Sequence, residues 1–165
     1  MPYVKLASGK IGTGRGLVHR DLKPQNIFLS GTGSALVAKV GDYGLAKAFD
    51  TAGLSGHTCA GDVMGTPQFM PRQQVLDFKF ARPEVDVWAM AASLYFMLTC
   101  KYPREFSRGK DPWAVVLGTP PVPIRQRVAS IPAKLAEVID QALVDKPDIG
   151  FKSAAEFKRA LERVL

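Results

Sequence analysis

The most continuous apolar stretch of the chain lies between residues 84 and 99, where apolar side chains fall on nearly every side of an α-helix. A helix with so little polar surface belongs inside a protein, so we predict that it forms the centre of the core. The apolar run from Val87 to Cys100 is too short to cross a membrane, follows Asp86 and contains Ser93 and Thr99. These features favour a buried helix over a membrane span.

Two more helices are predicted between residues 132 and 164. The first begins near Pro132, and the last opens on the capping box 153–156, in which a serine precedes a glutamate by three residues. A shorter helix is predicted near 111–117, with Asp111 as N-cap and Pro112 in its first turn. The apolar residues expected to face inward on the two long helices are Leu135, Val138, Ile139, Ala142, Leu143, Phe157, Ala160, Leu161 and Val164.

A β-hairpin is predicted where two short apolar runs, 27–29 and 36–40, flank a glycine-containing turn. Folding about this turn is expected to bring Asn26 opposite Val40, and so to place the Asn26 amide close to Asp42. Two oxygen ligands far apart in sequence then converge on one point, as a magnesium ion requires. The predicted fold class is therefore mainly α with a small β-hairpin.

Two segments carry no periodic pattern. Residues 1–16 contain Gly9, Gly12, Gly14 and Gly16, and we interpret them as a linker or insertion loop. Residues 45–72 are rich in glycine, serine and threonine, and a loop of this length is usually functional or disordered.

Composition narrows the classes of function. The 165 residues are 47% hydrophobic, which suits one globular domain, and the net charge is +7. The basic residues are dispersed and not interleaved with aromatic ones, so a nucleic-acid partner is disfavoured. Cys59 and Cys100 are the only cysteines, and no signal-type apolar run opens the chain. We expect two reduced thiols and a cytoplasmic protein.

The candidate chemistry begins with His19-Arg20-Asp21-Leu22-Lys23-Pro24-Gln25-Asn26 and continues with Asp42-Tyr43-Gly44, Gly65-Thr66-Pro67 and Asp86-Val87-Trp88. This ordered set resembles the eukaryotic-type (Hanks-type) serine/threonine protein kinases, with a bacterial appearance. The resemblance covers residues 17–165 and implies the C-terminal lobe of the protein-kinase fold. It places the catalytic loop at 19–26, the magnesium motif at 42–44, the activation segment at 42–73, the core helix at 84–99 and the C-terminal helices at 132–164.

The resemblance also implies roles for individual residues. Asp21 would accept the proton of the substrate hydroxyl, and Lys23 would neutralise the moving phosphate. Asn26 and Asp42 would hold the Mg²⁺ of Mg·ATP. His19 would be a packing residue, and Arg20 would engage a phosphate on the activation segment.

Further roles belong to the activation segment and the core helix. Thr66 would contact the catalytic Asp and Lys, and Asp86 would brace the backbone of the catalytic loop. Thr51, Ser55 and Thr58 are candidates for regulatory phosphorylation within reach of Arg20. Plain solvated hydroxyls are an equally good interpretation of each of these three.

The chain departs from the family in three ways. No glycine-rich loop, phosphate-anchoring lysine or partner glutamate of the N-terminal lobe precedes His19, nor does the helix that comes before the catalytic loop. The family's Ala-Pro-Glu reads Pro71-Arg72-Gln73, and the arginine that pairs with its glutamate aligns with Gly150. Both halves of that ion pair are lost together, so neither charge is left unpaired. Tyr43 replaces a phenylalanine.

We therefore expect a truncated serine/threonine kinase, inactive or crippled by itself, that uses ATP and Mg²⁺ on a protein substrate. The alternative is a non-catalytic, pseudokinase-like docking module. The expected partners are a protein substrate, the missing N-terminal lobe or a second copy of the chain, with no nucleic acid and no membrane span.

Overall fold

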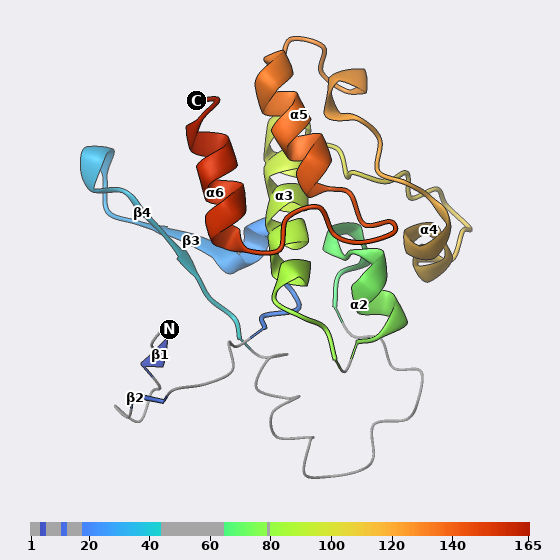
Figure 1. Cartoon of the computed structure of the whole chain (residues 1–165), viewed down its shortest axis with the longest axis horizontal. Helices are drawn as coiled ribbons and strands as arrows, with labels where there is room; N and C mark the ends of the chain where they lie inside the picture. The colour runs from blue at the N-terminus through green and yellow to red at the C-terminus, as the bar shows by residue number, and fades with distance from the viewer. Residues whose placement is uncertain (1–3, 6–10, 13–17, 44–64, 79) are drawn as a thin grey trace.

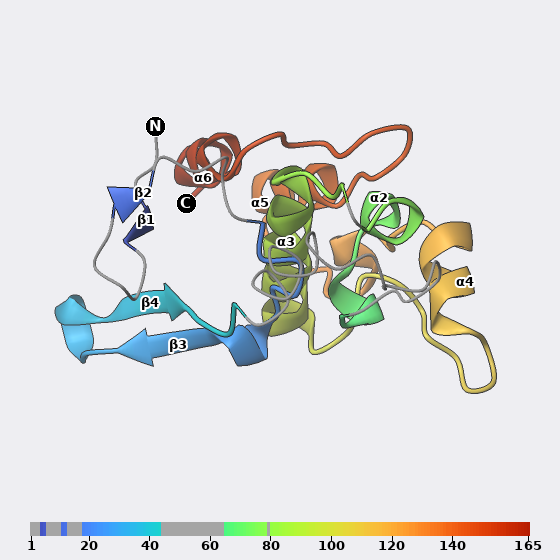
Figure 2. The ribbon, with the colours of Figure 1, turned by 90° about the horizontal axis from the view of Figure 1, so that it is seen from below.

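The computed structural model describes residues 4–5, 11–12, 18–43, 65–78 and 80–165. Helices gather around α3, with α6 to its left, α5 beside its upper part and α2 and α4 to its right (Figure 1). The hairpin β3–β4 projects from this helical body in both views (Figures 1 and 2). The predictions for Thr51, Ser55, Thr58 and Cys59 lie outside the described residues.

The central helix α3 spans Glu84–Thr99, and the prediction of a buried core helix is confirmed. Trp88 and Tyr95 have no exposed surface, and the indole N–H of Trp88 donates to the backbone oxygen of Leu143 at 2.9 Å. The hydroxyl of Ser93 donates to the backbone oxygen one turn earlier, which satisfies a buried polar group inside the helix. Only at the C-terminal end do Met97 and Leu98 reach the surface.

The other predicted helices form as well. α4 is Pro112–Gly118, α5 is Ala133–Ala142 and α6 is Ala154–Glu162. The side chain of Asp111 accepts the N–H of Trp113, as expected of an N-cap. α5 and α6 contact α3 and each other, which buries one face of each.

Two short elements lie at and just beyond the end of the segment that showed no periodicity. The 3₁₀ turn η3 spans Pro67–Phe69 and the helix α2 spans Arg72–Leu76. Each is too short to leave a periodic pattern in sequence. A further 3₁₀ turn, η4, spans Ile124–Gln126. η3 contacts both α3 and α4, so this segment rests on the core.

The hairpin joins β3, Ile27–Ser30, to β4, Val37–Val40, as predicted, with the 3₁₀ turn η2, Gly33–Ala35, at its tip. The predicted register was wrong by one residue, because Ile27 pairs with Val40. Residues Pro24–Asn26 wind into the 3₁₀ turn η1 and the strand begins at Ile27, so Asn26 lies opposite Gly41 and not Val40. The N–H of Gly41 then donates to the backbone oxygen of Asn26 at 2.9 Å, beside Asp42.

The predicted linker contains regular structure that the sequence did not indicate. β1, Val4–Lys5, pairs antiparallel with β2, Ile11–Gly12. Within the described part of the chain, no helix is long and apolar enough to cross a membrane. Cys100 is exposed at the surface.

Candidate active site

The loop 19–26, which we predicted to be the catalytic loop, is held on the core helix α3 by one carboxylate. Asp86, in the first turn of α3, accepts the backbone N–H of His19 at 2.8 Å and that of Arg20 at 2.9 Å. Burial raises the pKa of Asp86, and these two hydrogen bonds lower it again in part. The predicted bracing of the loop by Asp86 therefore has a direct geometric basis.

His19 lies inside the loop, with 3% of its surface exposed. Its Nδ1 accepts the N–H of Asp21 at 3.3 Å, which leaves the proton on Nε2 to donate to the backbone oxygen of Gly41 at 2.8 Å. Its ring also contacts that of Tyr43, 4.9 Å away between centroids. With both nitrogens engaged, the imidazole joins the loop to the end of β4, and this geometry supports a packing role.

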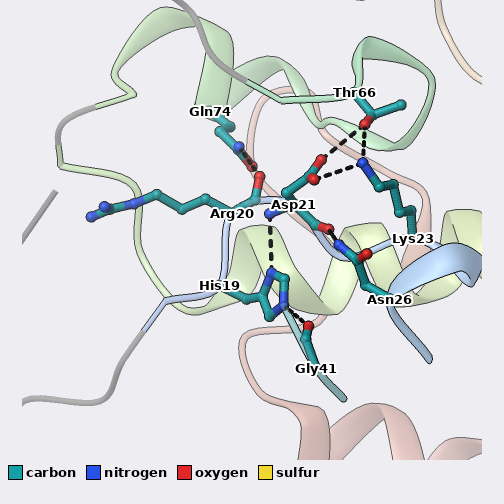
Figure 3. A network of polar contacts seen from close by, with 8 residues as sticks. All are labelled: His19, Arg20, Asp21, Lys23, Asn26, Gly41, Thr66 and Gln74. Carbon is teal, nitrogen blue, oxygen red and sulfur yellow. Dashed lines mark hydrogen bonds and ion pairs between the residues drawn. The ribbon is translucent and has the colours of Figure 1, made fainter. Parts of the chain in front are cut away.

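Asp21, Lys23 and Thr66 meet in a closed triangle (Figure 3). The ammonium of Lys23 lies 2.7 Å from Asp21 Oδ2 and donates to Thr66 Oγ1 at 2.9 Å. The Thr66 hydroxyl donates to Asp21 Oδ1 at 2.9 Å. Both Asp21 and Lys23 keep part of their side chains exposed, at 14% and 23%. A carboxylate and an ammonium are thus fixed side by side where a reactant can reach them.

Gly65 permits the approach of Thr66 to this triangle. Its φ is +125°, a conformation that L side chains rarely adopt. A Cβ there would come within 2.8 Å of the Met70 methyl and 3.6 Å of Asp21 Oδ1. The glycine before Thr66 is therefore part of the geometry of the site.

Asn26 is oriented by the same loop. Its side-chain N–H donates to the backbone oxygen of Asp21 at 2.8 Å, and only 5% of its surface is exposed. This bond uses the donor side of the amide and leaves Oδ1 available as a ligand. Asp42, one residue past Gly41, is exposed and has a φ of 57°. An amide oxygen and a carboxylate are hard oxygen donors of the kind that magnesium prefers, so these are the two side chains whose chemistry suits that ion.

Arg20 is placed apart from the triangle, and its side chain points away from Asp21 and Lys23 (Figure 3). Its backbone has a φ of 68°, and its carbonyl accepts the side-chain amide of Gln74 at 2.6 Å. Gln74 is almost fully buried, and sequence reasoning missed it. A polar residue in a short helix gives no periodic signal, so only its buried position marks it.

Comparison with known proteins agrees with this geometry. Residues 14–148 match the family model of the protein kinase domain. The chain is 36% identical to the serine/threonine-protein kinase Pkn1 of Myxococcus xanthus over 92% of its own length and 22% of that protein. It is 32% identical to PknA of Mycobacterium tuberculosis, over 94% of this chain and 34% of PknA. It is 35% identical to PknB of Mycolicibacterium smegmatis, over 90% of this chain and 23% of PknB.

The chain thus spans between about a fifth and a third of these relatives. The family model nevertheless covers well over half of this chain, and all three relatives are bacterial serine/threonine kinases by name. The chain therefore belongs to the protein kinase domain family, among the bacterial Hanks-type serine/threonine kinases.

Proposed function

We propose that this chain supplies the catalytic-loop half of a serine/threonine protein kinase site, in the C-terminal lobe of the fold. The reaction is transfer of the γ-phosphoryl group of ATP to a protein hydroxyl. The observation that carries the proposal is the triangle of Asp21, Lys23 and Thr66, in which base and cation share one hydroxyl. Phosphoryl transfer depends mainly on positioning and charge neutralisation, and this arrangement supports both.

Each residue of the site has a defined task in this proposal. Asp21 orients the substrate hydroxyl and receives its proton as the oxygen attacks phosphorus. Lys23 neutralises charge on the transferring group. Thr66 holds both side chains in register, since its hydroxyl donates to Asp21 while accepting from Lys23.

Asn26 and Asp42 are the residues that would hold the metal of Mg·ATP. When bound, magnesium neutralises the phosphate oxygens and orients the terminal phosphate. On the protein side, Asn26 contributes an amide oxygen whose orientation is set by its bond to the Asp21 carbonyl. Arg20, with its side chain turned outward, is proposed to engage a phosphate on the activation segment, at Thr51, Ser55 or Thr58.

Catalysis by the 165 residues alone is proposed to be weak or absent, because they include none of the N-terminal-lobe motifs that grip the nucleotide. We place the protein in the cytoplasm, where ATP and reduced thiols are available. Its proposed partners are a protein substrate and either a kinase N-terminal lobe or a second copy of this chain.

A non-catalytic interaction module is the second candidate. The observation that favours it is an apolar groove of about 610 Å³ between α3 and α6, lined by Met90, Phe157 and Leu161 among others. Apolar surface of this kind is commonly covered by a partner. We propose that this groove is occupied by a helix from the N-terminal-lobe side of a kinase, which would bind through its apolar face.

Calorimetry of Mg·ATP binding to the 165-residue chain separates the two candidates. We expect weak, magnesium-dependent binding that Asp42→Asn reduces by about tenfold or more, equivalent to about 1.4 kcal/mol. Asp148→Asn, the same change at an exposed position far along the chain, serves as the control. Absence of binding by a chain with a cooperative unfolding transition would refute the proposal that these residues assemble a nucleotide half-site by themselves, and would leave the interaction module for this chain.

A further inference from the structure

Arg104 and Asp145 form a buried ion pair that no family motif assigns. Their exposed fractions are 2% and 3%, and Arg104 Nη2 donates directly to Asp145 Oδ2. Isolated buried charges are costly, so each requires its partner and further hydrogen bonds. Burial lowers the pKa of Arg104, and the charge of Asp145 opposes that effect.

The guanidinium of Arg104 uses its remaining donors on two distant backbone oxygens. Nε donates to Thr119 at 2.9 Å, after the end of α4, and Nη1 donates to Met70 at 3.1 Å. The planar group also lies over the Trp88 ring, with its Cζ 4.7 Å from the ring centroid. Arg104 therefore fixes the carbonyl of Met70 relative to α3 and α4.

Asp145 fixes the other side of the same peptide stretch. Its Oδ2 accepts the N–H of Arg72 at 2.9 Å, and its backbone oxygen accepts the side-chain amide of Gln73 at 2.8 Å. The pair thus binds the backbone immediately before and immediately after Pro71. A segment held on both sides in this way has little freedom to shift.

The residues on both sides of this segment contact the catalytic loop. Four residues before Met70, Thr66 bonds to Asp21 and Lys23. One residue after Gln73, Gln74 donates to the carbonyl of Arg20. Any displacement of residues 70–73 would therefore move contacts that hold the proposed base and cation.

The position of this pair matters because the ion pair expected of the family is missing. Gln73 and Gly150 stand where its glutamate and arginine would be. Gly150 has no room for a side chain, because a Cβ there would lie 2.1 Å from the backbone oxygen of Gln141. An arginine at 150 is thus excluded, because the backbone at this position packs directly against the backbone of α5.

We propose that Arg104 and Asp145 are positioning residues, a relocated ion pair that anchors residues 70–74 and thereby holds Thr66 and Gln74 against the catalytic loop. The consequence for catalysis rests on the proposed kinase function, whereas the anchoring itself does not. Replacing both partners of a buried ion pair costs far less stability than removing only one, so the double change should loosen the segment without unfolding the domain.

The test is amide hydrogen exchange on the 165-residue chain carrying Arg104→Met and Asp145→Asn together. We expect exchange in 66–74 to become about tenfold faster or more, while that of α5 stays unchanged. Glu105→Gln is the matched control, since it removes the more exposed ion pair of Arg127 and Glu105. Unchanged exchange at 66–74 in the double variant would overturn the proposal.

A second readout reports on the catalytic loop itself. We expect Lys23 to be acetylated several-fold faster by an activated ester in the double variant, because its contacts with Asp21 and Thr66 loosen. Lys134, exposed on α5, gives the internal reference rate. Unchanged Lys23 reactivity would overturn the link to the catalytic loop. Failure of the chain to bind Mg·ATP would count against the proposed nucleotide half-site alone, since neither readout requires nucleotide.

Discussion

Gln73 donates its side-chain amide to the backbone of Asp145, and its own Oε1 is buried without a hydrogen-bond partner among the described residues. The family's glutamate at this place would add a second carboxylate beside Asp145 and remove the donor. We expect Gln73→Glu to lower the free energy of unfolding by about 1–3 kcal/mol at neutral pH, as measured in urea.

The matched control for this change is Gln141→Glu, which adds the same charge at an exposed site and should alter stability by less than about 0.5 kcal/mol. The loss in Gln73→Glu should shrink as the pH falls and the added carboxylate is protonated. A Gln73→Glu protein more stable than the original would mean that a nearby cation, such as Arg72 with its buried Nε, pairs with the added carboxylate.

Single residues differ in how far sequence could predict them. Asp21 and Lys23 are two positions apart in a recognisable motif, and Thr66 follows a glycine in another, so their meeting was foreseeable. Arg104 and Asp145 are 41 positions apart and belong to no motif. Only the fold brings them together. The sequence showed that the family's ion pair is lost at Gln73 and Gly150, but it did not show which residues take its place.

At the scale of elements, the capping box of α6 forms as predicted, except that its glutamate accepts a different backbone N–H. Ser153 Oγ accepts the N–H of Glu156 at 3.2 Å, as a capping box requires. The Glu156 carboxylate, however, accepts the N–H of Lys152 at 2.9 Å, one residue before the cap. The hairpin also forms as predicted but with one partner changed. Asn26 belongs to turn η1, so Ile27 is the residue that pairs with Val40.

The capping contact leads to a prediction for α6. We expect Ser153→Ala to lower the free energy of unfolding by about 1 kcal/mol, because the N–H of Glu156 loses its acceptor at a partly buried helix start. Urea unfolding followed by circular dichroism measures the change. Ser153→Asp keeps an acceptor and should remain within a few tenths of a kcal/mol of the original; equal losses in both variants would show that the hydroxyl does not cap the helix.

At the scale of the whole molecule, Asp86 is the joint between the catalytic loop and the helical core. Two effects compete at its carboxylate. Burial favours the neutral form, whereas the N–H groups of His19 and Arg20 favour the charged form, and burial is the larger effect, so the folded pKa lies above the ordinary 3.8.

Because the pKa of Asp86 is raised in the folded protein, stability should fall as the pH rises. Between 3.8 and the raised pKa, the folded protein binds more protons at Asp86 than the unfolded chain does. The contribution of this group to stability is therefore greatest below pH 3.8 and is lost as the pH rises through the folded pKa. We expect the difference in unfolding free energy between the original protein and Asp86→Asn to fall over this window and to stay flat above it.

Subtraction isolates Asp86, because every other titrating group is common to both proteins. The amide keeps one acceptor for the two N–H groups, so Asp86→Asn should be less stable by about 1–3 kcal/mol yet still fold. Denaturant titrations from pH 3 to pH 8 measure the difference, and its total fall, at about 1.36 kcal/mol per pKa unit, gives the shift itself. A difference that rises with pH would show that the two backbone hydrogen bonds outweigh burial. Asp86 would then hold the catalytic loop most strongly as a full carboxylate.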